Sequence, residues 1–461
     1  MAGERFVVLG LAPARAGWFR AVGSWANSGA LPAEFVKCLS AEEVGARLDS
    51  GRPFSALVAD GCLPSVDRDL VARASAAGCA VFVVHDRRVD RDWPALGVAK
   101  VLAADFGRDE LLNALSAHAR LVQRSSARAG DVVGRPASGG WRGTVVAVTG
   151  PGGTGASTAA MALAQALGDD VRHSGMVLLA DLRLHAELAM LHDVGDVGPG
   201  VQELVEAHRA GMPPADEVRR LVVCPEGRPY SLLLGLRRAR YWPALRPQAF
   251  AAALESLERA YRVVVCDVDP DVEGEDDGGS LDVEERNVMS RTALARAQAV
   301  FAVGSPSLKG LHSLVRVVEG LLAFGVAPAR IVPVLNRAAR SGRARAALVA
   351  ALAELVGPLL PVPLDAEPGE AGLRGPNAVP GLRGPNAISG LAGPIFLPDR
   401  RVEEALRDGA RLPGALAAPL AGALRAVAER ARPADGPGPA AEPEPVRPGS
   451  LGHYTAEAAG S

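Results

Sequence analysis

A glycine-rich segment that begins at residue 150 has the residue types and the spacing of a loop that binds phosphate. It reads GPGGTGAST from Gly150, which matches the Walker A pattern GxxxxGK[ST] except that Ala156 stands where the pattern has lysine. In such a loop the backbone N–H groups and the N-terminus of the following helix surround phosphate oxygens. The candidate nucleotide-binding residues here are Gly150, Gly152, Gly153, Thr154, Gly155, Ala156, Ser157 and Thr158.

The elements that must position this loop are also present in the sequence. An apolar run, VVAV, precedes it, and an alanine-rich stretch of helical periodicity follows it, within residues 144–168. Two later apolar runs end in aspartate, MVLLAD at Asp181 and YRVVVCD at Asp267, and we expect them to be neighbouring parallel strands that end beside the loop. Because a carboxylate at such a strand end can reach Mg²⁺ or its water shell, the candidate metal ligands are Ser157, Asp181 and Asp267.

In this order the motifs resemble the MinD/ParA family of deviant Walker A ATPases. The family's KGGxGK[ST] loop matches residues 151–157, and its DxD switch matches Asp181-Leu182-Arg183. Its strand-end asparagine, which contacts the base, matches Asn336 in IVPVLNRA, with Arg337 beside it, and its PxxxVxxA pattern matches residues 398–405. The resemblance implies Mg-ATP as the cofactor, no other metal, and a homodimer.

Three departures from the family pattern concern hydrolysis. The signature lysine is Pro151, the Walker lysine is Ala156, and the second switch aspartate is Arg183. Phosphoryl transfer depends on positioned charge, so we expect hydrolysis to be impaired, and the sequence leaves enzyme activity open. Two readings of the site remain: weak Mg-ATP binding through the loop amides, Ser157, Thr158 and Asp267, or a vestigial pocket in a fold kept as a scaffold.

The first 121 residues alternate apolar strands with helical stretches, and Asp60 ends the third strand. The pattern resembles a response-regulator receiver domain, in which the phosphoacceptor occupies this place. The acidic pair that would hold Mg²⁺ is missing from GLAPAR, and Ala104-Asp105 stands where the family has its lysine. We therefore interpret this part as a pseudo-receiver used for binding, with Asp60 as a solvated turn residue rather than a phosphoacceptor.

The expected fold class is α/β, with a receiver-like doubly wound domain followed by a MinD/ParA-like P-loop domain built on a mostly parallel sheet. The expected division is a pseudo-receiver at 1–122, a linker at 123–142, the P-loop domain at 143–432 and a disordered tail at 433–461. Residues 271–287 are strongly acidic and predict a solvated loop, with docking of a basic partner as the alternative. Residues 372–389 hold two near-identical nine-residue copies, which we interpret as a duplication inside a loop.

Composition excludes several classes of protein. The 461 residues carry 50 basic and 52 acidic side chains, a net charge of −2, so no nucleic-acid partner is expected. No apolar window of about 18 residues predicts a transmembrane helix, and membrane association is expected only at the periphery, through partners. The five cysteines form no CxxC pair and are interpreted as small buried hydrophobic residues in a reducing cytosol.

A pseudo-receiver in front of a deviant P-loop domain makes the chain similar to the TadZ/CpaE group of pilus-localisation proteins. The actinobacterial branch of septum-site-determining (Ssd) proteins is the most similar. The resemblance implies a regulatory and localisation protein, cytoplasmic and recruited to the pole or septum, with pilus, secretion or division machinery as partners. The alternative is an active MinD/ParA-type ATPase that cycles between a nucleotide-dependent dimer and a monomer. A phosphorylation-controlled regulator is disfavoured, because the receiver chemistry is missing.

Overall fold

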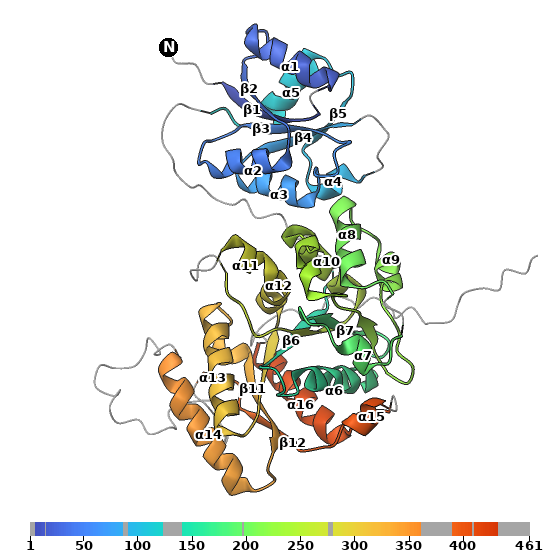
Figure 1. The fold of residues 1–461 in the computed structure, drawn as a ribbon, viewed down its shortest axis with the longest axis vertical. Coiled ribbons are helices and arrows are strands. Elements are labelled where there is room, and N and C mark those ends of the chain that lie inside the picture. The colour runs from blue at the N-terminus through green and yellow to red at the C-terminus, as the bar shows by residue number, and fades with distance from the viewer. Residues whose placement is uncertain are drawn as a thin grey trace, which may run out of the picture.

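In the computed structural model the chain forms two parallel sheets, each with helices on both faces (Figure 1). The structure describes residues 5–13, 15–85, 91–122, 141–195, 198–274, 280–360, 390–407 and 410–431. The expected α/β fold class is confirmed. The expectations for residues 123–140 of the linker, for the repeat at 372–389 and for the tail at 433–461 lie outside the described residues.

The first sheet has the strand order β2-β1-β3-β4-β5, and all of its paired strands are parallel. This is the order of flavodoxin-like doubly wound sheets. Its strands are β1 (Phe6–Leu11), β2 (Ala33–Cys38), β3 (Ala56–Asp60), β4 (Ala80–His85) and β5 (Lys100–Ala103). Its helices are α1 (Gly17–Asn27), α2 (Ala41–Asp49), α3 (Arg68–Ala76), α4 (Trp93–Leu96) and α5 (Arg108–His118). We call this part the receiver-like unit.

Two apolar layers hold the receiver-like unit together, because alternate residues of its buried strands point to opposite faces. Leu9 and Leu57 pack with side chains of α2, α3 and α4 on one face. Val8 and Val58 pack with side chains of α1 and α5 on the other. Ser40 caps α2 by accepting a hydrogen bond from the N–H of Glu43 (3.2 Å).

The second sheet has the order β12-β11-β10-β6-β9-β7-β8, again with only parallel pairs between its strands. Its strands are β6 (Thr144–Thr149), β7 (Val177–Leu182), β8 (Ser231–Leu233), β9 (Val263–Val268), β10 (Ala299–Gly304), β11 (Ile331–Ala338) and β12 (Ile395–Pro398). We call this sheet with its helices the P-loop unit.

The helices of the P-loop unit follow or connect these strands. They are α6 (Ala156–Asp169), α7 (Leu188–Leu191), α8 (Val201–Ala210), α9 (Ala215–Arg220), α10 (Pro247–Ala260), α11 (Leu281–Arg286), α12 (Val288–Arg296), α13 (Leu308–Ala323), α14 (Gly342–Val356), α15 (Glu403–Arg407) and α16 (Gly414–Ala431). Within the described residues, 3₁₀ turns are found at η1 (Ala239–Ala244), η3 (Pro328–Arg330) and η4 (Gly357–Leu359).

The core of the P-loop unit also has two layers. On one face α6 and α16 pack against β6, β9 and β10. On the other face α8, α10, α12 and α13 cover the same sheet, and both layers can be followed in Figure 1. The helix α6 is almost entirely buried, and its alanines allow close packing beneath the phosphate loop.

Two expectations from the sequence are corrected here. The acidic stretch is not a loop throughout, because residues 281–286 form α11. Its Asp282 and Glu284 lie in the first turn and Arg286 in the last, where each charge suits the helix dipole. Cys62 and Cys224 are exposed because they lie in connections, whereas the other three cysteines are buried.

Among the described helices, none is long and apolar enough to cross a membrane.

Candidate functional site

The phosphate loop, residues 150–157, joins β6 to α6, as its sequence predicts. Gly153 and Gly155 have φ angles of +78° and +85°, the left-handed region that glycine adopts without strain. Gly152 and Gly153 are exposed, and the N-terminus of α6 has no side-chain cap. The loop therefore keeps backbone amides and a helix N-terminus available for an anion.

A hydrogen-bonded chain closes the phosphate loop from within. The Thr154 hydroxyl donates to the carbonyl of Pro151 (2.7 Å), and Nδ2 of Asn336 donates to the carbonyl of Thr154 (2.8 Å). Oδ1 of Asn336 accepts from the N–H of Arg337 (2.9 Å), where φ is +57°. The side chain of Asn336 is buried and holds the loop, while Arg337 is exposed.

The two strand-end aspartates lie side by side. β7 and β9 pair in parallel with Asp181 opposite Asp267, and both residues are fully buried. Burial raises the pKa of Asp181, and the neighbouring Asp267 raises it further. Burial also raises the pKa of Asp267, while Arg183 and the Ser157 hydroxyl act in the opposite direction. Ser157 and both aspartates are thus brought together, as the sequence predicts for neighbouring strand ends.

Arg183, which replaces the second switch aspartate, points back into this group of carboxylates. Its Nη1 lies 3.3 Å from Oδ1 of Asp267, and its Nη2 lies 3.4 Å from Oδ1 of Asp269. Its side chain is only 15% exposed. The other oxygen of Asp269 accepts from the N–H of Leu184 (2.7 Å), which fixes the loop that carries Arg183. An internal cation therefore neutralises the candidate Walker B carboxylate.

Mg²⁺ does not fit this arrangement of side chains. Both oxygens of Asp181 accept backbone hydrogen bonds, from Leu188 (2.8 Å) and from Arg183 (3.4 Å). Oδ2 of Asp267 is buried and has no hydrogen bond of normal geometry within the described residues. A divalent cation at that oxygen would meet the guanidinium of Arg183 at short range, and like charges repel.

Sequence reasoning identified Arg183 as a departure but missed what it contacts. The signal for Asp269 was present in CDVDPD, where a second acid follows Asp267 by two residues. Parallel strand pairing brings the loops after β7 and β9 together, so an arginine two residues after Asp181 can reach these acids. The bond from Asn336 to the carbonyl of Thr154 had no comparable signal in the sequence.

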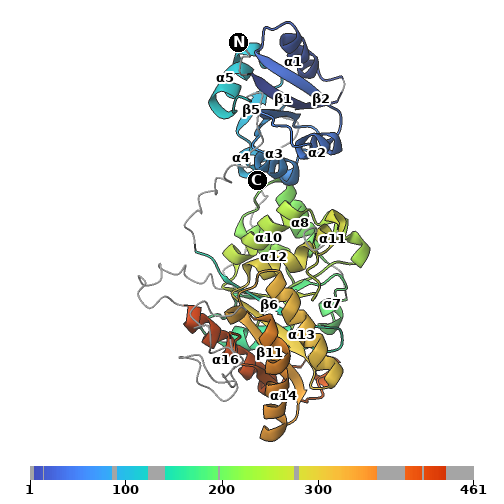
Figure 2. The same ribbon diagram turned by 90° about the vertical axis from the view of Figure 1, so that its left-hand side faces the viewer.

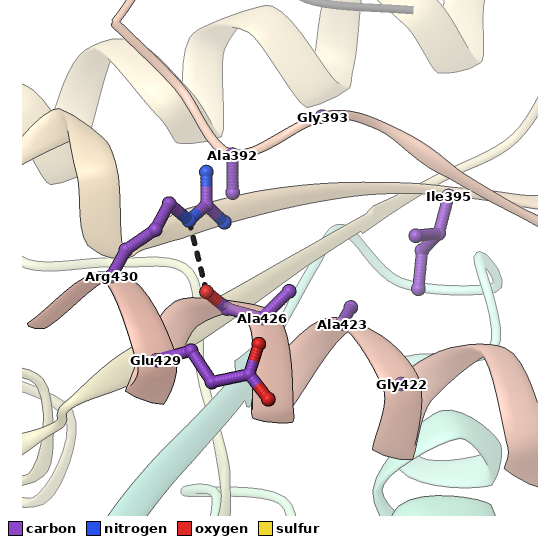
Figure 3. A pocket seen from close by; sticks show the side chains of 8 residues that line it. All are labelled: Ala392, Gly393, Ile395, Gly422, Ala423, Ala426, Glu429 and Arg430. Carbon is purple, nitrogen blue, oxygen red and sulfur yellow. Dashed lines mark hydrogen bonds between the residues drawn. The ribbon is translucent and has the colours of Figure 1, made fainter. Parts of the chain in front are cut away.

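Two hollows in the P-loop unit differ in their relation to the loop. One, of about 470 Å³, touches Pro151 and is otherwise lined by residues 270–273 and by α13. The other, between β12 and α16, is shown in Figure 3. It is lined mostly by small side chains, and Arg430 there donates to the carbonyl of Ala426 (3.0 Å). None of the residues that line this second hollow was predicted for the site, so we place the candidate site at the phosphate loop.

Asp60 ends β3, but its carboxylate is not simply solvated, which corrects the sequence interpretation. Its side chain is half-buried, its Oδ2 accepts from Nε1 of Trp18 (3.2 Å), and its Oδ1 accepts from the N–H of Cys62 (3.0 Å). The indole N–H of Trp18 thus donates to a carboxylate oxygen that a receiver would use to bind a metal or accept a phosphoryl group.

Comparison with known proteins gives structural matches only. No family model matches the chain, and no curated protein matches it. A ParA family ATPase from Chlorobium tepidum is similar over 61% of this chain and 98% of its own, at 15% identity and a TM-score of 0.44. A putative plasmid partition protein from Borrelia burgdorferi bound to AMPPNP is similar over 63% of this chain and 100% of its own, at 12% identity and a TM-score of 0.41. The cell division ATPase MinD of Pyrococcus furiosus is similar over 62% of this chain and 99% of its own, at 18% identity and a TM-score of 0.39. These values are low, so the functional argument rests on the side chains of this chain.

Proposed function

We propose that this chain is a regulatory and localisation protein of the TadZ/CpaE/Ssd kind, with a P-loop unit that does not hydrolyse ATP. The observation that carries the proposal is the contact between Arg183 and Asp267, in a loop where Ala156 replaces the Walker lysine. A working ATPase needs the carboxylate for Mg²⁺ and the lysine for the phosphates. Here one is neutralised and the other is absent.

Each part of the hydrolytic machinery is lost for a separate physical reason. Ala156 places no cation on the phosphates, and Pro151 removes both a cation and a backbone donor. Arg183 replaces the acid that would orient the attacking water. Such contributions are each worth several kcal/mol of transition-state stabilisation, so their joint loss removes turnover rather than slowing it slightly.

The groups that remain in the loop can bind a nucleotide but not hydrolyse it. The exposed amides around Gly152 and Gly153 and the uncapped N-terminus of α6 can receive phosphate oxygens. The guanidinium of Arg183 pairs with Asp267, so it takes the place of Mg²⁺ at that carboxylate and not at the phosphates. Nucleotide binding would then be weak and regulatory, and if it is absent the fold acts as a scaffold.

The role of the rest of the chain follows from the same argument. The receiver-like unit keeps the doubly wound fold with Asp60 hydrogen-bonded to Trp18, so it serves as a binding surface and not as a phosphorylated switch. We propose that the protein forms a homodimer and reaches the pole or septum through proteins of the pilus, secretion or division machinery. A net charge of −2 gives no electrostatic reason to expect nucleic acid as the partner.

A localisation experiment with a matched variant tests this role. A fluorescent fusion of the whole chain is compared with its Ser157→Ala variant, which removes the hydroxyl that an ATPase would use for Mg²⁺. We expect both to form the same foci at the pole or septum. Ser116→Ala, which removes an exposed hydroxyl from α5 of the receiver-like unit, is the matched control. Foci that disperse only in Ser157→Ala, with the fold intact, would favour the cycling ATPase instead.

A deletion strain distinguishes a role in pilus placement from a role in septum placement. If the chain places pilus machinery, loss of the gene removes surface pili and leaves septum spacing unchanged. If it places the septum, cell length changes instead. Normal pili and normal septa in the deletion strain, together with a diffuse fusion protein in the strain that expresses it, would refute a localisation role.

A further inference from the structure

The receiver-like unit contacts the P-loop unit through three consecutive residues at the start of α3. Figure 1 shows α3 and α4 facing α8 and α10, and the view turned by 90° in Figure 2 agrees. The residues are Asp67, Arg68 and Asp69, and each reaches a different group on the other unit. We call them the docking triplet.

Arg68 binds the C-terminal end of α8. Its Nε donates to the carbonyl of His208 (2.9 Å), and its Nη2 donates to the carbonyl of Gly211 (2.9 Å). Nη1 donates to the carbonyl of Ala95 in the receiver-like unit (3.3 Å). Arg68 is only 7% exposed, which is unusual for arginine, and its charge lies where the helix dipole favours a cation.

Asp69 binds the N-terminal end of α10. Its Oδ1 accepts from the N–H of Gln248 (3.0 Å) in the first turn of that helix. The helix has no side-chain cap of its own, because Arg246 stands at the N-cap position, and Pro247 at the first position has no N–H. The cap that α10 lacks therefore comes from the other unit, and the negative charge suits this helix end.

Asp67 completes the contact. One oxygen caps its own helix by accepting from the N–H of Leu70 (3.1 Å). The other accepts from Nη2 (3.1 Å) and Nε (3.3 Å) of Arg209, in the last turn of α8. Arg68 and Asp69 thus bind helix ends of the P-loop unit, and Asp67 binds Arg209, which also pairs with Glu206 on its own helix (2.8 Å).

We propose that the docking triplet is a binding site for the paired ends of α8 and α10 of the same chain, and that it holds the two units as one body in solution. The partner chemistry is specific: two carbonyls at a helix C-terminus beside a free amide at a helix N-terminus and an arginine. The proposal goes beyond the proposed function, because it holds whether or not the phosphate loop binds nucleotide.

Hydrogen exchange of the whole chain, read at the amide of Gln248, tests the proposal. In Asp69→Ala this amide loses its acceptor, and exchange should quicken roughly five- to tenfold, the usual worth of a helix cap. Asp69→Asn keeps an acceptor and should retain most of the protection. Asp109→Ala, which removes an exposed acid from α5 of the same unit, is the matched control and should change nothing at Gln248.

Small-angle scattering of the same chains reads the arrangement of the units. Arg68→Ala should increase the radius of gyration, because the units separate. Arg108→Ala, which removes an exposed arginine from α5, should leave the radius of gyration unchanged. Asp67→Asn keeps the cap on α3 but loses the ion pair with Arg209. The double variant Asp67→Asn with Arg209→Gln should therefore have nearly the same radius of gyration as either single variant. Unchanged scattering and unchanged exchange in Arg68→Ala and Asp69→Ala would refute the proposal. Loss of protection at Gln248 when the wild type is diluted to monomer would also overturn it, because the triplet would then bind a second copy.

Discussion

The guanidinium of Arg183 lies 3.3 Å from the carboxylate of Asp267. Asp267 lies on β9, and Arg183 directly follows β7, the strand that pairs with β9. In a hydrolysing P-loop protein this carboxylate serves a divalent cation. Here a side chain of the same chain supplies the positive charge. Arg183 therefore stands beside Asp267 where a metal ion would otherwise compensate the carboxylate.

Removing this internal cation should destabilise the fold. Arg183→Ala leaves Asp267 buried without its counter-charge, and breaking a buried pair costs about 3 kcal/mol of unfolding free energy. Urea unfolding at neutral pH measures the difference. Arg108→Ala, whose pair with Asp109 is exposed, should leave the midpoint unchanged. An Arg183→Ala midpoint equal to that of the wild type would show that the pair contributes nothing.

Restoring the Walker lysine should improve binding more than turnover. Ala156→Lys places a cation on the phosphates, and we expect ATP to bind about 1.5–3 kcal/mol more tightly, the worth of a hydrogen bond to a charged group. Turnover should stay low, because Pro151 and Arg183 are unrepaired. Calorimetric titration of ATP into both forms is the measurement. Unchanged binding in Ala156→Lys would mean that the pocket is closed to nucleotide.

Asp60 should not accept a phosphoryl group. Its two oxygens already accept hydrogen bonds from Trp18 and Cys62, and neither a metal-binding acidic pair nor the receiver lysine is present. Intact mass after incubation with acetyl phosphate should show no stoichiometric adduct. An adduct that disappears in Asp60→Asn would establish the phosphoacceptor that we exclude.

Stability should depend on pH through the buried aspartates. Burial raises the pKa of Asp181 to about 8 and that of Asp267 to about 6, whereas both are near 4 in the unfolded chain. A group whose folded pKa is raised retains its proton in the fold. Its stabilising effect is therefore complete below about pH 4 and is lost as the pH rises through the folded pKa.

Asp181→Asn tests this dependence. From pH 4 to 8 the wild type should lose up to about 1.4 kcal/mol of unfolding free energy per pH unit relative to the variant. Denaturant midpoints of both proteins across the range give the difference. Parallel curves for the two proteins would show that Asp181 is ionised throughout.

Much of the fold could be predicted from the sequence, because apolar runs ending at Asp60, Asp181 and Asp267 mark strands of parallel sheets. The pairing of Asp181 with Asp267 followed from the same logic and is confirmed by the strand register. The contacts of Arg183 could not be derived, because a single residue type does not show which way a long side chain turns. The docking triplet was missed for a related reason. Asp67-Arg68-Asp69 looks like an ordinary charged helix start until another unit supplies its partners.

The most direct test of the central claim is ATP turnover by the purified wild-type chain with saturating Mg²⁺. The account predicts phosphate release no faster than that of Ser157→Ala, with less than one ATP consumed per chain during the assay. Multiple turnovers that require Mg²⁺ and are lost in Ser157→Ala would contradict it, because they would show that Arg183 gives way to the metal and that the site hydrolyses nucleotide.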